Sequence, residues 1–301
     1  MAQQRPMVTG FYHEETNSIA YVVVDPATRR CALIDPVLDF DRACRGTHTQ
    51  FADEMAGFVR SQGLTVEWIL DTHPHADHFS AAPYLKDLFG APTAIGEHVV
   101  TVQKIWKNIY HLPDFPADGS QWDRLFKDGE RFRIGELKAE VLFSPGHTAA
   151  SITYVVDDAA FIHDTLFMPD GGTARADFPG GDAQALYCSM RRILSLPPET
   201  RLFTGHDYQP GGRAPQWEAT VAQQRQHNIH MHDGVSEEDF VRMRQEKDRT
   251  LAFPGLLLDA LQVNIRGGRL PEPEANGVSY LKIPVNRFQD TGCAAIRDIG
   301  R

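Results

Sequence analysis

A seven-residue segment, 72–78, concentrates side chains that bind metal ions. Its sequence, Thr-His-Pro-His-Ala-Asp-His, places His73, His75, Asp77 and His78 within six consecutive positions. Neutral imidazoles and carboxylates are good ligands for zinc and iron. Side chains two positions apart in an extended segment point the same way, so His73 and His75 can converge on one point. The alternative, a solvated turn, has to be weighed against the ligand-type residues elsewhere in the chain.

Three further segments each offer one more side chain of this kind: His147, Asp164 and His206. Gly146 permits unusual backbone angles, so that His147 can turn inward. Asp164 follows an apolar segment, where a carboxylate is costly unless it is paired or bound to a metal. Taken alone, Asp164 could equally cap a turn. Together, seven ligand-type residues on four segments predict a metal site.

These residues follow segments that have the pattern of buried strands. The segments are 66–70, 137–143, 159–162 and 201–204, all apolar and partly β-branched. Residues 79–89 have a helical pattern that stops at Gly90. The segment 72–78 is thus expected between a strand end and a helix start, where α/β proteins often bind ligands. Strands that share a sheet would bring these ends together.

The rest of the chain also alternates between segments with a strand pattern and segments with a helical pattern. Strands are predicted within 8–24 and over 31–34, 93–96 and 151–156, and helices over 51–61, 97–110, 185–195, 213–228 and 236–249, with a helix or extended element over 256–263. Residues 97–122 are expected to form a wall or lid beside the site, or else a helix that covers a core edge. His227, His230 and His232 are predicted on a solvated surface, and the charged run 237–249 on an exposed helix face.

Composition indicates a soluble globular protein with a large core, since 42% of the 301 residues are hydrophobic and 23% are charged. A net charge of −10 argues against nucleic acid or an anionic membrane as the main partner. No apolar run approaches the ~20 residues of a membrane span. The N-terminal residues have no apolar signal core, so we expect a cytoplasmic protein. The oligomeric state stays open, a homodimer being one candidate.

Cysteine usage agrees with a reducing compartment. The four cysteines, Cys31, Cys44, Cys188 and Cys293, are widely spaced and form no CxxC motif. A disulfide framework is therefore not expected.

The ligand segments resemble those of the metallo-β-lactamase superfamily. The resemblance rests on 72–78, on Ser-Pro-Gly-His-Thr at 144–148, on Asp164 and on Gly205-His206, and it spans roughly residues 8–230. It implies an α+β fold, a four-layer αβ/βα sandwich with metal at one edge of two facing sheets. We expect residues 1–301 to form one such domain, with 97–122 as an insertion and 235–301 as a C-terminal extension.

Within the superfamily the chain is most similar to the longer bacterial persulfide dioxygenases, the ethylmalonic encephalopathy protein family. The matching segments are Leu-Ile-Asp-Pro-Val at 33–37, Gly-Thr-Ala-Arg-Ala-Asp-Phe at 172–178, and Gly-His-Asp-Tyr at 205–208. The resemblance implies an oxidoreductase that converts glutathione persulfide and O2 to sulfite and glutathione at one iron(II) per chain. Short human-type members have a cysteine where Thr173 stands, which argues against a thiol role at that loop.

By this resemblance the iron ligands are His73, His147 and Asp164, a two-histidine, one-carboxylate set that leaves positions open for O2 and substrate. The other ligand-type residues, His75, Asp77, His78 and His206, would orient the ligands and hold water. The spacing of these seven residues does not by itself distinguish the iron ligands from the residues that surround them.

Substrate contacts are predicted less directly. Arg175 is a candidate for a glutathione carboxylate, which a guanidinium can bind bidentately. Its alternative is a loop-fixing pair with Asp177 or Asp170. Tyr208 lies beside the site in sequence and can donate to the substrate, or else pack in the core. Tyr110, on the expected wall, is a weaker candidate.

The main alternative function is a dinuclear zinc hydrolase of the glyoxalase II type (a hydroxyacylglutathione hydrolase) or a lactonase. There a metal-bound hydroxide attacks a carbonyl, and Asp164 bridges the two metals. All seven residues that such a site needs are present. A non-catalytic metal-dependent sensor is disfavoured by the intact ligand set, and a nuclease by the acidic charge balance.

Overall fold

The structure, a computed structural model, describes residues 5–288 and is built around two large sheets. The strands are β1 Met7–His13, β2 Ser18–Val24, β3 Arg30–Ile34, β4 Val37–Asp41, β5 Gly46–His48, β6 Thr65–Leu70, β7 Phe79–Ser80, β8 Thr93–Gly96, β9 Arg124–Phe126, β10 Arg131–Ile134, β11 Leu137–Phe143, β12 Ile152–Val156, β13 Ala159–His163, β14 Arg201–Thr204 and β15 Glu218–Thr220. The α-helices are α1 Gln50–Ser61, α2 Ala82–Phe89, α3 Val99–Tyr110, α4 Ala183–Ile193, α5 Val221–His227, α6 Glu237–Asp248 and α7 Leu257–Asn264. The sheets are ordered β1-β2-β3-β6-β8-β9 and β10-β11-β12-β13-β14-β15, with a small third sheet β5-β4-β7.

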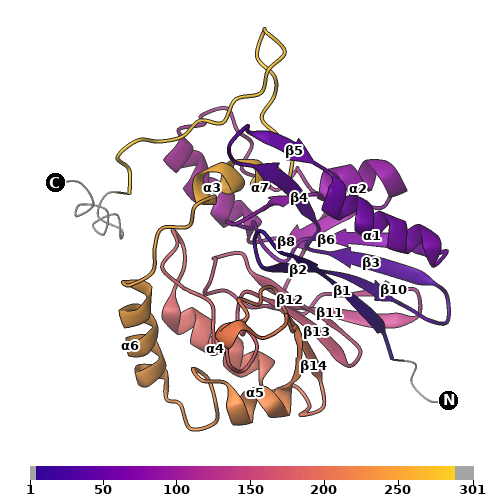
Figure 1. Ribbon diagram of the computed structural model, residues 1–301, viewed down its shortest axis with the longest axis vertical. Helices are drawn as coiled ribbons and strands as arrows, with labels where there is room; N and C mark the ends of the chain where they lie inside the picture. The colour runs from indigo at the N-terminus through magenta and orange to yellow at the C-terminus, as the bar shows by residue number, and fades with distance from the viewer. Residues whose placement is uncertain (1–4, 289–301) are drawn as a thin grey trace.

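A hydrophobic core fills the space between the two large sheets. In β2, Ile19 and Tyr21 point into this core, while Ala20 and Val22 point to the opposite face of the sheet. This alternation follows from the two-residue period of a strand. The outer face of the first sheet packs on α1 and α2, and that of the second on α4, α5 and α6 (Figure 1). The four-layer αβ/βα arrangement predicted from the sequence is therefore confirmed.

Two predicted helices begin later than expected. Residues Phe79–Ser80 form β7, which pairs with β4, and α2 begins only at Ala82. Likewise β15 pairs with β14 before α5 begins at Val221. The side chain of Thr220 and that of Gln223 form a capping box there, which fixes the helix start. In both segments, pairing with another strand overrode the local helical pattern.

Residues 97–122 cover a core edge, and none of them lines the cavity beside the predicted metal site. The apolar face of α3, with Val102 and Trp106, is buried in one cluster with Leu257 and Leu261 of α7. This fits the second of the two expectations for the segment, because the apolar face of a helix is stable when it is buried in a core. Within residues 5–288, none of the helices is long and apolar enough to cross a membrane.

Candidate metal centre

Four strands deliver the ligand-type residues to one edge of the sandwich. Strand β12 is antiparallel to both β11 and β13, and β13 is parallel to β14, so β11, β13 and β14 run in the same direction. Their carboxyl ends carry His147, Asp164 and His206 to a common edge. In the facing sheet, β6 ends immediately before the segment 71–78. The site therefore lies where the ends of both sheets meet.

Two glycines let the chain segments approach closely at this edge. A Cβ atom at Gly205 would lie 2.5 Å from Oδ1 of Asp164, and one at Gly146 would lie 2.3 Å from the backbone of Leu186. Gly146 also has a φ of 137°, a conformation that other residues rarely adopt. Any larger residue at either position would displace a ligand-bearing loop.

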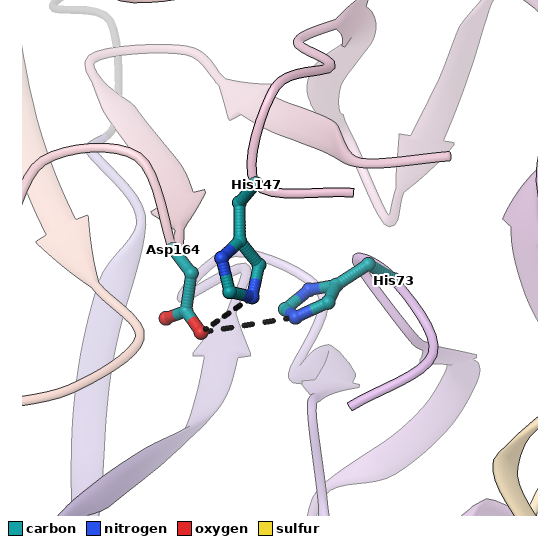
Figure 2. Close-up of side chains that lie close together, drawn as sticks. All are labelled: His73, His147 and Asp164. Carbon is teal, nitrogen blue, oxygen red and sulfur yellow. Dashed lines mark ion pairs between the residues drawn. The ribbon is translucent and has the colours of Figure 1, made fainter. Parts of the chain in front are cut away.

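The structure brings His73, His147 and Asp164 together in a compact group. Their ligand atoms all lie within 4.8 Å of one another, and all three residues are buried. Asp164 Oδ2 is 3.8 Å from Nε2 of His73 and 3.5 Å from Nε2 of His147. Both imidazoles point toward that carboxylate, and the three residues come from three separate segments of the chain (Figure 2). These distances suit three groups arranged around one small cation.

Hydrogen bonds fix both imidazoles so that Nε2 carries a lone pair. His147 donates from Nδ1 to the carbonyl oxygen of Arg175 over 2.9 Å. Thr72 donates its hydroxyl proton to Asp35, so His73 donates from Nδ1 to that hydroxyl oxygen over 3.0 Å. Nε2 of His73 is buried without a partner, as is Oδ1 of Asp164. Unpartnered buried acceptors of this kind fit a metal ion, and outer hydrogen bonds like these orient metal ligands.

His75 and His78 are held differently. His75 turns Nε2 to Oδ1 of Asp35, 3.0 Å away, and its Nδ1 has no partner. Burial would lower the pKa of His75, but the Asp35 carboxylate outweighs it and raises that pKa to about 9. His78 donates from Nδ1 to the carbonyl oxygen of Phe79. His75, Asp77 and His78 form a second group of neighbouring ligand atoms, separate from the first.

His206 links the two groups electrostatically. Its Nε2 lies 3.3 Å from Asp164 and 3.5 Å from Asp77. Burial would lower the pKa of His206, but these two carboxylates raise it to about 10. Burial would raise the pKa of Asp164, but the surrounding imidazoles, His206 first, hold it well below its usual range. Asp164 is therefore ionised at neutral pH, as a metal ligand must be.

The site opens into a cavity of about 420 Å³. Its metal-site end is lined by Asp77, His147, Asp164 and His206, and its walls by Phe167, Thr173, Arg175, Phe178, Tyr208, Arg244, Lys247, Leu251 and Pro254, among others. The ring of Tyr208 stacks on His206 at 5.5 Å between centroids, and the residue is 58% exposed. Tyr208 thus lines the cavity and is not packed in the core, and its hydrogen bond to the substrate stays a prediction.

Two predicted substrate contacts are occupied by other partners. Arg175 binds Asp177 bidentately, at 2.6 and 2.8 Å, and donates to the carbonyl oxygen of Ala252. This is the loop-fixing pair that the sequence allowed. Tyr110 is buried, donates to the carbonyl oxygen of Leu258, and does not line the cavity. Tyr110 thus belongs to the α3–α7 core, because α3 is not a wall of the site.

Sequence reasoning missed two cationic residues of α6 that line the cavity, Arg244 and Lys247, which together form its cationic corner. The run 237–249 is not wholly exposed, because Arg244 and Asp248 are buried and paired, with Arg244 donating from Nη2 over 2.6 Å. Lys247 Nζ lies 3.1 Å from Nε2 of His230, which is not a solvated surface histidine. His230 accepts from the backbone N–H of Thr173. The sequence did carry a signal for this pair, because Arg244 and Asp248 are four residues apart and so lie side by side on one face of a helix.

Comparisons with known proteins identify relatives with different names. The model of the "Metallo-beta-lactamase superfamily" matches residues 15–206. A "Beta-lactamase hydrolase-like protein" of Xylella fastidiosa (strain Temecula1) is 62% identical over 288 residues, which cover 96% of this chain and 67% of that protein. "Glyoxylase B2" of Dictyostelium discoideum is 48% identical, over 88% of this chain and 92% of that protein.

A mitochondrial "Persulfide dioxygenase ETHE1" from Homo sapiens is more distant. It is 30% identical over 195 residues, 64% of each chain. Among solved structures, that of ETHE1 from Myxococcus xanthus aligns with a TM-score of 0.70 and 28% identity, covering 87% of this chain and all of that one. The named relatives thus include hydrolase-like proteins at high identity and a dioxygenase at low identity.

Proposed function

Because the chain belongs to the metallo-β-lactamase superfamily, whose fold it has, we propose that it is a persulfide dioxygenase with one iron(II) per chain. The observation that carries this proposal is the compact group of His73, His147 and Asp164. Two histidines and one carboxylate form the ligand set of non-haem iron oxygenases. His75 lies outside this group and bonds to Asp35. The similarity to ETHE1, in sequence and structure, supports the same reaction.

The proposed reaction consumes glutathione persulfide, O2 and water, and yields glutathione, sulfite and two protons. An iron(II) ion held by His73, His147 and Asp164 would supply the affinity for O2 and for the persulfide sulfur that brings the two reactants together. The protein positions the site: the Arg175 carbonyl orients His147, and Thr72 orients His73. The apolar cavity walls, including Phe167 and Phe178, limit the access of water to the reacting sulfur.

The cationic corner suits a substrate that carries a carboxylate. His230 accepts at Nδ1 from Thr173, so in its neutral form it bears its proton on Nε2. Burial, with the charges of Lys247 and Arg244, lowers the pKa of His230 to about 4, so the ring is neutral at pH 7. Two donors, Nε2 of His230 and Nζ of Lys247, therefore face each other at 3.1 Å. Lys247 lines the cavity, so an anionic oxygen of a bound substrate would accept a charge-assisted hydrogen bond from its Nζ.

Replacing Lys247 with alanine is therefore expected to raise KM on the order of 10-fold with kcat little changed, as loss of one charge-assisted hydrogen bond predicts. Steady-state kinetics with glutathione persulfide measure this. Glu246→Ala, an exposed change on the same helix, is the control and should leave KM unchanged. With a persulfide that lacks carboxylates, Lys247→Ala and the unmodified protein should have the same KM. An unchanged KM for glutathione persulfide would remove Lys247 from substrate binding.

A second candidate is the dinuclear zinc hydrolase. By sequence similarity, the names of the relatives favour it over the dioxygenase, since the more similar proteins are called hydrolase-like and glyoxylase. The structure offers one observation in its favour: Asp164 Oδ2 is close to His206 as well as to His73 and His147. A carboxylate so placed can bridge two metals.

One experiment separates the two candidates. Protein purified without oxygen is analysed for iron, zinc and manganese per chain, and O2 uptake and sulfite are followed after glutathione persulfide is added. The proposal predicts about one iron per chain, with O2 consumed and sulfite formed. Two zinc ions per chain, no O2 uptake and rapid hydrolysis of a glutathione thioester would overturn it in favour of the hydrolase.

A further inference from the structure

The backbone of the segment 73–78 is held by a side chain from far along the chain. The segment lies between β6 and β7 and belongs to neither a helix nor a strand, so its backbone groups need partners elsewhere. Among residues 5–288, one side chain alone, the amide of Asn264, forms hydrogen bonds with this backbone. Asn264 is the last residue of α7 and is 2% exposed. It lies beyond the region 15–206 that the superfamily model matches.

The Asn264 amide makes three hydrogen bonds. Its Nδ2 donates to the carbonyl oxygen of His75 over 2.8 Å and to that of His78 over 2.7 Å. Its Oδ1 accepts from the backbone N–H of Ser80 over 2.9 Å. These partners fix the orientation of the amide, because a rotated amide would turn its own oxygen toward two carbonyl oxygens. One buried side chain thus holds the chain on both sides of Asp77, which lines the cavity at the metal site.

The end of α7 fits closely against β7, which carries Ser80. Gly268 follows the helix with a φ of 84°, and its N–H donates to the carbonyl oxygen of Val263 over 3.2 Å. A Cβ atom at Gly268 would lie only 2.4 Å from the carbonyl oxygen of Ser80, so glycine is required there. Phe79 is buried in one cluster with Val263. Packing therefore holds the end of α7, and Asn264 with it, beside the segment.

We propose that Asn264 is a positioning residue of the metal site, which holds the segment 73–78 so that its ligand-type side chains keep their positions. Asn264 does not line the cavity, so it acts through the backbone of this segment. A backbone that is already fixed needs no further ordering when a metal binds, and this favours binding. The proposal rests on the proposed function only in that the segment carries metal ligands, and it applies equally to one iron ion or two zinc ions.

Two variants of α7 separate positioning from general stability. Asn264→Leu keeps the branched shape of the side chain and removes all three hydrogen bonds. Gln262→Met is the matched control, because Gln262 is 1% exposed and exchanges two hydrogen bonds with the backbone of Lys282, which does not line the cavity beside the metal site. Both variants should unfold at lower urea concentrations than the unmodified protein, since each leaves buried polar groups without partners.

Cobalt(II) is the probe of the metal site, because its binding and visible absorption spectrum are measured without turnover. Metal-free protein is titrated with cobalt(II). Asn264→Leu should bind it on the order of 10-fold less tightly and with a changed spectrum, as loss of a group that orients metal ligands predicts. Gln262→Met should match the unmodified protein in both. Unchanged affinity and spectrum in Asn264→Leu would overturn the proposal, and so would an equal change in Gln262→Met.

A milder variant gives the same test if Asn264→Leu does not fold. Asn264→Ala leaves space in which a water molecule can bond to the freed carbonyl oxygens of His75 and His78. It should therefore be more stable than the leucine variant and still bind cobalt(II) less tightly than Gln262→Met does. Equal affinity of Asn264→Ala and Gln262→Met would show that Asn264 has only a structural role.

A measurement on the unmodified protein tests the contacts themselves. In metal-free protein with ¹⁵N-labelled asparagine, the Nδ2 signal of Asn264 is identified by its absence from Asn264→Ala. Both of its protons should exchange slowly with solvent, since both are buried and hydrogen-bonded. Rapid exchange would overturn the proposal. Failure of the protein to oxidise persulfide, with the expected cobalt(II) result, would overturn only the proposed function.

Discussion

Asp164→Ala is expected to lose the bound metal and turnover together. Asp164 Oδ2 lies within 3.8 Å of three imidazole Nε2 atoms, those of His73, His147 and His206. Removing a hydrogen-bond partner of a ligand typically costs 10- to 100-fold in metal affinity, so loss of a ligand should cost more than about 100-fold. The measurement is metal content by elemental analysis after equilibration with limiting iron(II).

Two further variants make this result specific. Asp164→Asn keeps the shape of the side chain and loses only its charge, so it should fold normally and still bind metal poorly. Asp233→Ala, which removes an exposed carboxylate paired with Arg225, should keep full metal content. Full iron occupancy in folded Asp164→Ala protein would show that the assigned ligand set is wrong.

Arg244→Leu is expected to destabilise the protein by about 3–5 kcal/mol, because it leaves the buried carboxylate of Asp248 without its counter-charge. The two side chains are only 1% and 6% exposed. Urea unfolding measures the change. Arg242→Leu is the matched control on the same helix, since Arg242 and its partner Asp239 are both 58% exposed, and it should cost far less. Equal losses in the two variants would contradict this account.

The same substitution should weaken metal binding from a distance. Arg244 donates to the carbonyl oxygen of Thr173, and Asp248 accepts from the backbone N–H of Ala176. Between these anchors lies Arg175, whose carbonyl oxygen orients His147. We therefore expect folded Arg244→Leu protein to bind iron on the order of 10-fold less tightly. Unchanged iron affinity would mean that the strip 173–176 holds its position without α6.

Local sequence patterns were sufficient for the outline of the fold. The apolar segments before His73, His147, Asp164 and His206 all form strands, because short, largely apolar and partly β-branched runs favour buried strands and are visible in the sequence itself. The start of α2 was wrong because Phe79 and Ser80 pair with β4, which no local pattern records. Residues 289–301, with Cys293, lie outside the part of the chain that the structure describes.

By itself, the sequence determined which side chains gather at the strand ends, since their types and their positions after apolar segments are local properties. Only the tertiary structure decided how each is used. In the folded chain, Arg175 binds Asp177 and Lys247 contacts His230. Ser18 donates a hydrogen bond to Asp77, which is 59 positions away in the sequence. Hydrogen bonds and ion pairs act over a few ångströms in space. They therefore depend on how the two sheets and α6 pack, which residue spacing along the chain does not encode.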